Sequence, residues 1–423
     1  MRHLSLPSRM FIAWIIVWSI VLAGFGASRD TTAQEPAVNF GELTASPSFP
    51  EEIVFSVSAQ ATEEFDRVEL LFNAVGEESL RLITAETEQG SEISLDFGLN
   101  MYQNYYPPGL DLEYRWRVTS SSGEVSESET QIVSWYDTRY EWTSVSSEQV
   151  TLYTYDTNDN FAGEILDSAQ GTIDELQTEF GVERSLPLRI WIYDSQDDLG
   201  GATQPNSEPW IAGVSYPGRY LILAAVPDGN SQELRRVIPH EVSHQVLFQA
   251  TENPFNLPAT WLDEGLATYN QDVGTGGYVA LVEQAVDDGE LMPISTLNTS
   301  FPFDDSFQLA YAQSYSVISF IIQTFGEEAL GVVLSSYKDG VSHEEAVQRG
   351  LGISIDELDS RWRASLGVGD DNGAGGGTIG LGGADWGNLI LALALLIAVP
   401  VMAVRLWRGR GSTLPDETEG VPA

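Results

Sequence analysis

Residues 237–248 read VIPHEVSHQVLF and contain two of the four histidines in the 423-residue chain. His240 and His244 are four positions apart, and Glu241 follows the first of them. On a helix, positions i and i+4 lie on one face about 6 Å apart, so both imidazoles can point at a single ion. Glu241 lies one step round the helix, where it can reach a metal-bound water as a general base.

The opposing interpretation is an inert pair of histidines on an ordinary buried helix. In a composition so poor in histidine, His-Glu-x-x-His arises in roughly two shuffled chains per thousand, so the motif favours a metal site. Apolar neighbours support a buried helix: Val237, Val242, Val246, Leu247 and Phe248.

Pro239 opposes a regular helix, because its ring and missing N–H disturb the preceding turn at a cost of about 3 kcal/mol. Either the helix is kinked at Pro239, or the motif helix begins there.

Composition excludes several classes of site. The chain has no cysteine, so disulfides, thiolate ligands and thiol nucleophiles are excluded. A metzincin-type site requires a glycine three residues and a histidine six residues after His244, where this chain has Leu247 and Ala250. Of the other histidines, His3 lies in the N-terminal leader. His343 follows a serine typical of an N-cap, so we expect it to begin a surface helix.

The third ligand is therefore expected to be a carboxylate. The segment ATWLDEGLATYN (259–270) reads as a second helix and offers two adjacent acids. Glu264, twenty residues after His244, is favoured, and Asp263 is the alternative.

HEVSH followed by WLDEGLATY resembles the gluzincin metallopeptidases, specifically the peptidase-MA-like group. The resemblance covers roughly residues 150–366 and ends in GISIDELDSRWRASLG, which is similar to the closing helix of that group. It implies one catalytic Zn²⁺ bound by His240, His244 and Glu264, with Glu241 as the catalytic base.

One position departs from the pattern of this family. Thermolysin-like members place an aspartate four residues after the ligand glutamate, where it holds a histidine; this chain has Thr268 there. A threonine can still hydrogen-bond an imidazole, although it tunes the basicity of the ligand less strongly.

The resemblance also implies a tyrosine that stabilises the oxyanion at the scissile carbonyl. LAYAQSYSVISF (309–320) offers Tyr311 and Tyr315 on one helical face, and we place Tyr311 ahead of Tyr315. The alternative is that both are packing aromatics. By analogy of fold, RYLILAAV (219–226) or WIAGVSY (210–216) could line the cleft and bind a substrate backbone as an added strand.

The chain as a whole is predicted to be α+β, with an immunoglobulin- or fibronectin-like β-sandwich before the metallopeptidase domain. Six strands are predicted in the sandwich, at 53–59, 67–75, 80–86, 92–97, 112–120 and 130–136. After it we predict strands at 188–193 and 219–226, and helices at 161–180, from Asn230 or Ser231 through the motif, and at 259–271, 276–288, 307–324, 327–337, 342–350 and 355–366.

The ends of the chain carry membrane signals. Arginines precede an uncharged N-terminal stretch, and arginines follow a second uncharged stretch of spanning length near the C-terminus. The predicted divisions are a signal peptide or uncleaved anchor (1–33), the sandwich (35–140), the metallopeptidase domain (141–366), a Gly-rich linker (367–385), a transmembrane helix (386–407) and a cytoplasmic tail (408–423).

These features predict a single-pass, membrane-anchored and extracytoplasmic zinc metallopeptidase that cleaves a peptide or protein substrate. The net charge of −42 argues against nucleic acid as a partner, since such a surface repels phosphate. The alternative is a catalytically silent cell-surface binding protein that uses the peptidase fold as a scaffold. A base placed beside an intact ligand set favours the enzyme.

Overall fold

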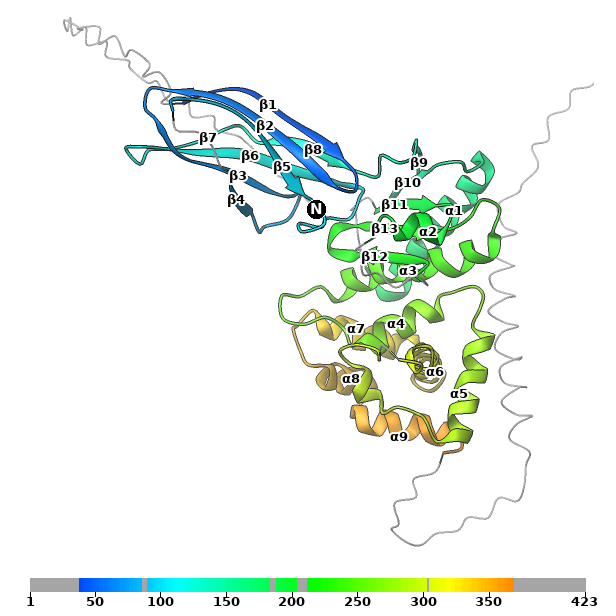
Figure 1. Cartoon of the computed structure of the whole chain (residues 1–423). Helices are drawn as coiled ribbons and strands as arrows, with labels where there is room; N and C mark the ends of the chain where they lie inside the picture. The colour runs from blue at the N-terminus through cyan, green and yellow to red at the C-terminus, as the bar shows by residue number, and fades with distance from the viewer. Residues whose placement is uncertain (1–37, 86–89, 183–187, 204–210, 303, 369–423) are drawn as a thin grey trace, which may run out of the picture. The chain divides into compact units, whose positions relative to one another are not determined.

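The N-terminal part of the protein is built from two antiparallel sheets (Figure 1). The computed structural model describes residues 38–85, 90–182, 188–203, 211–302 and 304–368. One sheet has the order β1-β2-β5, and the other has the order β4-β3-β6-β7 with β8 also paired to β6. The strands are β1 (Val38–Ser48), β2 (Glu52–Ala61), β3 (Phe65–Ala74), β4 (Arg81–Ala85), β5 (Glu92–Asn100), β6 (Leu110–Ser120), β7 (Val125–Glu127) and β8 (Gln131–Trp135).

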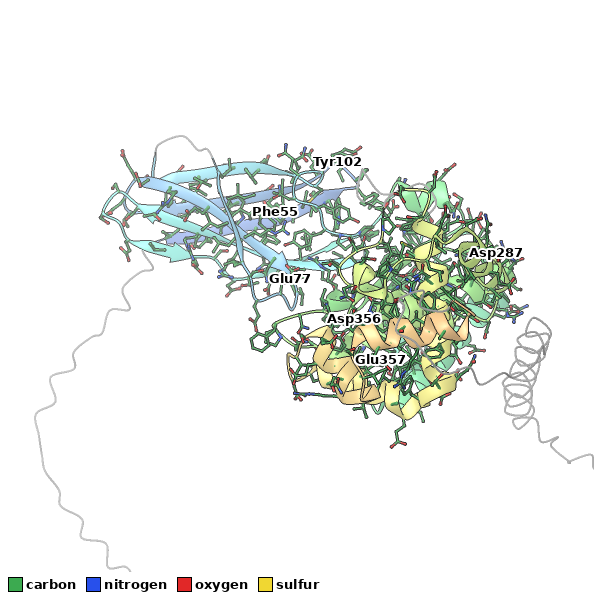
Figure 2. The ribbon with its side chains drawn as sticks, turned by 90° about the horizontal axis from the view of Figure 1, so that it is seen from below. Phe55, Glu77, Tyr102, Asp287, Asp356 and Glu357 are labelled. Atoms are coloured by element: carbon green, nitrogen blue, oxygen red, sulfur yellow. The ribbon has the colours of Figure 1, made fainter. Side chains whose placement is uncertain are left out.

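Alternate side chains of these strands share one core. In β2, Ile53, Phe55 and Val57 are buried and the residues between them are less so. Phe55 lies between the sheets (Figure 2), and its ring centroid is 4.8 Å from that of Tyr114 on β6. This period of two is what the sequence predicts for half-buried strands, and all six predicted strands are confirmed. β1 and β7 were not predicted.

A mixed five-stranded sheet of order β12-β13-β11-β10-β9 follows. β11 is parallel to both β10 and β13, whereas β9 and β12 at the two ends are antiparallel to their neighbours. Its elements and the helices between them are β9 (Thr143–Ser146), β10 (Val150–Thr154), α1 (Asp159–Phe180), β11 (Leu188–Tyr193), α2 (Gln196–Gly200), β12 (Gly213–Tyr216), η1 (Pro217–Arg219), β13 (Leu221–Ala225) and α3 (Ser231–Thr251).

β11 is buried on both faces because its alternate side chains enter two different cores. Ile190 and Ile192 pack in one core with residues of α1 and α3. Trp191 and Tyr193 belong to the same core as the buried residues of the sandwich. The sheet therefore carries α1 and α3 on one face, and α2 and the sandwich on the other.

The motif helix α3 is continuous through Pro239, so the alternative that it begins at Pro239 is wrong. Its N-cap is Asn230, the first of the two predicted alternatives. Because proline has no N–H, the carbonyl of Arg235 lacks its partner in the helix. The backbone N–H of Asp272 donates to that carbonyl over 3.1 Å, which ties the end of the next helix to α3.

The remaining helices pack around a third core that contains Trp261, Tyr337 and Trp362. They are α4 (Thr260–Tyr269), α5 (Gly276–Asp288), η2 (Ile294–Leu297), α6 (Phe307–Phe325), α7 (Glu327–Tyr337), α8 (His343–Leu351) and α9 (Ile355–Ser365). Each predicted helix is confirmed with bounds within two residues.

Within the described ranges, no single helix is both long and apolar enough to cross a membrane. Only α6 and α7 meet that criterion together, as a pair bent by 116°. The predicted signal peptide, transmembrane helix and cytoplasmic tail, and all but the first two residues of the linker, lie outside the described residues.

Candidate metal centre

Three side chains from two helices converge on one point. His240 and His244 of α3 and Glu264 of α4 offer ligand atoms that all lie within 4.8 Å of one another. Nε2 of His240 is 3.5 Å and Nε2 of His244 is 3.7 Å from Oε2 of Glu264. In a tetrahedral Zn²⁺ site with bonds near 2.1 Å, neighbouring ligand atoms are about 3.4 Å apart. The three atoms therefore have almost the spacing of a zinc site.

The carboxylate of Glu264 shows that the residues present fit a cation. Its Oε2 is buried and has no hydrogen-bond partner among the described residues, although it faces both imidazoles. Burial raises the pKa of Glu264, but the charge of His244 and the nearby polar groups of His240 and Tyr311 outweigh it and lower the pKa overall. A buried, ionised oxygen without a partner is costly unless a cation is close. Two imidazoles and one carboxylate form a zinc ligand set.

Each imidazole is held at its second nitrogen by a residue of the α4 region. Nδ1 of His244 lies 2.8 Å from Oδ1 of Asp263. Nδ1 of His240 lies 2.8 Å from the side-chain amide of Gln271. Metal binding through Nε2 leaves the proton on Nδ1, and Nδ1 of His244 then donates to the Asp263 carboxylate. Nδ1 of His240 faces Nε2 of Gln271, so the amide must turn over to present its oxygen as the acceptor. These contacts orient both rings.

The structure also places the two other residues considered near the ligands. Asp263, the less favoured ligand, lies outside the cluster and bonds to His244. Thr268, which was considered able to bond an imidazole, is completely buried, and its hydroxyl has no partner within the described part of the chain. The residue that contacts the imidazole of His240 is Gln271, which was not predicted from the sequence. The available signal was spacing, because positions 264, 268 and 271 follow the i, i+4, i+7 pattern of one helix face.

Charge from the two acids dominates the surroundings of His244. Burial alone would lower its pKa, but the carboxylates of Asp263 and Glu264 outweigh burial and raise the pKa of His244 to about 10. Without a metal, the imidazole is therefore protonated at neutral pH. Because a metal ligand must be neutral, metal binding displaces that proton.

Glu241 lies between the cluster and the edge of the sheet. It is 6% exposed, and burial is the main cause that raises its pKa. Its carboxylate packs against β12, where a Cβ built on Gly213 would lie 2.5 Å from Oε1 of Glu241. One turn on, Nε2 of Gln245 donates to Oγ of Ser215 over 2.7 Å and to the carbonyl of Leu221 over 3.1 Å. The Glu241 side chain is thus fixed beside the edge strand.

Tyr311 on α6 reaches the cluster. Its ring centroid is 6.5 Å from that of His240, and its hydroxyl is near enough to Glu264 for that carboxylate to raise the pKa of the phenol. Burial, followed by the charges of Glu264 and Glu241, raises the pKa of Tyr311 well above its ordinary value. The phenol therefore stays protonated and can act as a donor.

The other candidates from the sequence have different partners. The ring of Tyr315 contacts those of Tyr269 and Tyr278, at centroid distances of 6.2 and 6.3 Å. His343 is the first residue of α8, as expected, and its Nδ1 lies 3.0 Å from the hydroxyl of Tyr337. The structure brings Tyr311, rather than Tyr315, to the three clustered residues.

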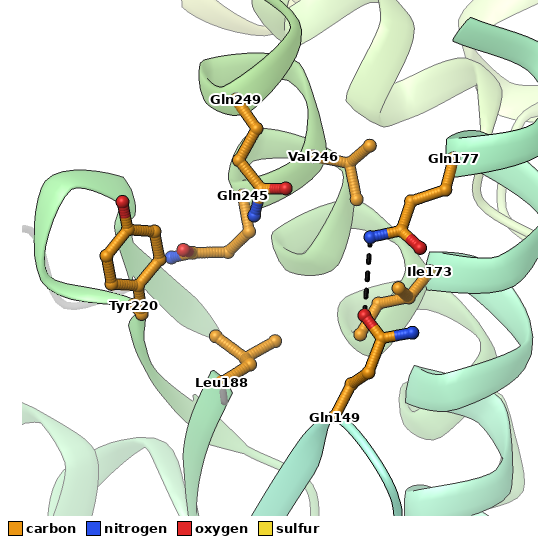
Figure 3. Close-up of a pocket in the computed structure, with 8 residues that line it drawn as sticks. All are labelled: Gln149, Ile173, Gln177, Leu188, Tyr220, Gln245, Val246 and Gln249. Atoms are coloured by element: carbon orange, nitrogen blue, oxygen red, sulfur yellow. Dashed lines mark hydrogen bonds between the residues drawn. The ribbon is translucent and has the colours of Figure 1, made fainter. Parts of the chain in front are cut away.

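A small cavity beside α3 is too small for a substrate (Figure 3). Its volume is about 10 Å³, room for about one water. Oε1 of Gln245 and Oε1 of Gln249 have no partner among the described residues, and a buried water would satisfy both. The lining residues are Gln149, Ile173, Gln177, Leu188, Tyr220, Gln245, Val246 and Gln249.

Comparison with solved structures gives similarity at low sequence identity. An M1 zinc metallopeptidase from Deinococcus radiodurans is 13% identical with a TM-score of 0.36, covering 74% of this chain and 90% of that one. A mutant of the M1 enzyme from the same organism, bound to a Tyr-Ser-Ala substrate, has the same identity and TM-score and covers 77% and 92%. A polysaccharide deacetylase from Bacillus cereus is 8% identical with a TM-score of 0.21, covering 40% and 56%.

No curated protein sequence matches the chain. A family model described as the peptidase MA superfamily matches residues 168–368. The matched segment contains α3 and α4 and all three clustered residues. Over residues 168–368, the chain is therefore similar to the peptidase MA superfamily.

Proposed function

We propose that the protein is a zinc-dependent metallopeptidase that hydrolyses peptide bonds. The observation that carries this proposal is the convergence of His240, His244 and Glu264, with the unpartnered oxygen of Glu264 facing both Nε2 atoms. The match of residues 168–368 to the peptidase MA superfamily model supports it.

In this proposal, Glu241 and Tyr311 have separate catalytic roles at the metal cluster. A zinc ion bound to the cluster supplies a Lewis acid and lowers the pKa of a bound water. Glu241 accepts a proton from the attacking water and delivers it to the leaving amine. Its burial, which raises its pKa, helps it retain that proton between the two steps. Tyr311 donates a hydrogen bond to the oxyanion at the scissile carbonyl.

The substrate proposed for this site is an extended peptide segment. β12 is the last strand in the order of its sheet, so its outer edge is not paired with any described strand. A peptide can add to such an edge through backbone hydrogen bonds. Gly213 of this strand contacts Glu241, so an added peptide would pass directly beside the base.

The experiment compares the purified full-length chain with its Glu241→Gln variant. We expect one zinc ion per wild-type chain by elemental analysis and cleavage of a peptide library. The variant should retain zinc and lose at least about a hundredfold in kcat/KM, because general-base catalysis contributes that much or more. Glu252→Gln, an exposed residue at the end of the same helix, is the matched control and should behave as wild type.

Two results would contradict this proposal. Full activity in Glu241→Gln, or wild-type protein without stoichiometric zinc, would exclude the mechanism. Binding of library peptides without cleavage would instead indicate the alternative function, a silent surface-binding protein built on the peptidase fold.

The location is proposed from the sequence alone. The two uncharged stretches near the ends and their flanking arginines favour a single-pass membrane protein with residues 35–366 outside the cytoplasm. Protease added to intact cells should then degrade this part and spare a tag on the C-terminus. Complete protection of both parts would contradict the topology.

A further inference from the structure

The turn between β5 and β6 carries a tyrosine of the sandwich to the edge strand of the peptidase sheet. The hydroxyl of Tyr105 lies 3.1 Å from the hydroxyl of Tyr216, the last residue of β12. The Tyr105 hydroxyl also donates to the carbonyl of Ala202 over 3.3 Å. A phenol has only one proton to donate, so Tyr105 must accept from Tyr216. The two hydroxyls and the carbonyl therefore form one directed chain from β12 to the segment after α2.

A second contact joins the sandwich to the residues just after β12. Arg219, the last residue of η1, forms an ion pair with Glu77 of the sandwich, and both side chains are about one-quarter exposed. Its guanidinium also lies 5.0 Å from the ring centroid of Tyr106. The end of β12 is therefore held to the sandwich at two points, three residues apart in sequence.

β12 lies between the sandwich and the helix that carries the base. Side chains alternate along a strand, so Gly213 and Ser215 share one face and Tyr216 lies on the other. The first face contacts α3, through Glu241 and Gln245. The opposite face carries Tyr216 to the sandwich core. β13 is its only strand partner within the described sheet. Contacts made by the sandwich therefore fix the backbone that passes beside Glu241.

We propose that Tyr105 is a positioning residue for the peptidase site, so that the sandwich helps to build the substrate cleft. This inference rests on the proposed peptidase function. Through Tyr216, Tyr105 holds β12 in the position at which an added peptide backbone presents its scissile carbonyl to Glu241. Substrates long enough to pair along β12 depend on this contact, and dipeptide substrates do not.

The test uses the full-length zinc-loaded chain and the variant Tyr105→Phe, which removes the hydroxyl and keeps the ring. KM for a peptide of about ten residues should rise about fivefold, the equivalent of one lost hydrogen bond. The kcat for that peptide, the kinetics on a dipeptide and the zinc content should stay at wild-type values. Tyr102→Phe is the matched control: Tyr102 belongs to the same turn, is 51% exposed (Figure 2), and should leave every value unchanged.

Hydrogen exchange provides a readout that does not need activity. In Tyr105→Phe the amides of β12 should exchange faster, while those of β13 keep their wild-type rates. Unchanged exchange in β12 together with unchanged KM would overturn the proposal. Loss of zinc, or faster exchange throughout the chain, would also overturn it, because the residue would then serve general stability. If the wild-type chain cleaves no peptide, the proposed function fails, and exchange alone decides whether Tyr105 positions β12.

Discussion

Individual residues show how the two clustered histidines are held. Asp263 holds His244, and Gln271 holds His240, each over 2.8 Å. Both partners come from the α4 region, which also supplies Glu264. The orientation of the imidazoles therefore depends on the same segment as the carboxylate, and a change there affects all three ligands together.

Replacing Gln271 with alanine should weaken zinc binding. The imidazole of His240 loses its partner at Nδ1, and losses of this kind typically cost about 10- to 100-fold in metal affinity. Competition with a chromophoric chelator measures the effect. Thr268→Val is the control, because its hydroxyl has no partner among the described residues and its removal should leave zinc affinity unchanged. A larger loss in Thr268→Val than in Gln271→Ala would refute this assignment.

Replacing Gly213 with alanine should disable the base. The new methyl group would lie 2.5 Å from Oε1 of Glu241, so the carboxylate must move. A displacement of about 1 Å in a catalytic group costs on the order of a hundredfold in rate. Steady-state kinetics on a peptide substrate should show a fall of that size in kcat. Gly218→Ala, whose methyl group would have 3.8 Å to its nearest neighbour, should keep wild-type kinetics.

Among the secondary-structure elements, the long helices were predictable from the sequence because they obey one period over many residues. α5 and α7 have the predicted bounds, and α3 begins after the predicted N-cap. β12 lies within 210–216, which the sequence offered only as an alternative cleft-lining segment, because its four residues are all half-buried and show no alternation. Its pairing depends on β13 and on contacts far along the chain, which no local pattern records.

The part of the candidate site that lies within one helix was predictable from the sequence, whereas contacts between helices were not. The spacing of His240, Glu241 and His244 is local to one helix, and composition left a carboxylate of α4 as the third ligand. The partners of the imidazoles were not predictable, since they depend on how two helices pack. Asp263 and Glu264 are adjacent in sequence, and only the packing of α4 on α3 shows which one faces Nε2.

The contact between α4 and α6 should be sensitive to one added methyl group. A Cβ on Gly265 would lie 2.7 Å from the backbone oxygen of Ser314, so Gly265→Ala must separate the helices. We expect a loss of about 1–3 kcal/mol in the free energy of unfolding, together with weaker zinc binding because Glu264 moves. Gly331→Ala on α7 meets nothing within 4 Å and should stabilise the protein by about 0.5–1 kcal/mol. Equal stability of both variants in urea unfolding would contradict this view.

In the molecule as a whole, Asp198 links the segment after β8 to the peptidase sheet. Tyr140 donates to Asp198 over 2.6 Å, and Tyr155 of the sheet region donates to it over 3.0 Å. The rings of the two tyrosines stack at 4.0 Å. Ser195 adds a third hydrogen bond of 2.7 Å. Burial raises the pKa of Asp198, but the three hydroxyl donors outweigh it and lower the pKa below the ordinary value of 3.8.

This network should make stability depend on pH. The carboxylate has a lower pKa in the folded than in the unfolded protein, so it stabilises the fold above pH 3.8. That contribution is lost as pH falls through the folded pKa. Asp198→Asn should lower the free energy of unfolding at pH 7 by about 1–3 kcal/mol, and its deficit should shrink below pH 3.8. Urea unfolding at several pH values tests this, with the exposed Asp197→Asn as control. A deficit independent of pH would contradict it.

The residue at position 239 affects both the stability of α3 and the retention of a metal ion by the cluster, in opposite directions. An ordinary residue there would return an amide hydrogen to Arg235 and complete the ladder of α3, a gain of up to about 3 kcal/mol. The same hydrogen would compete with Asp272 for that acceptor and loosen its neighbour Gln271. A variant selected only for heat resistance could therefore acquire this change and release its zinc more readily.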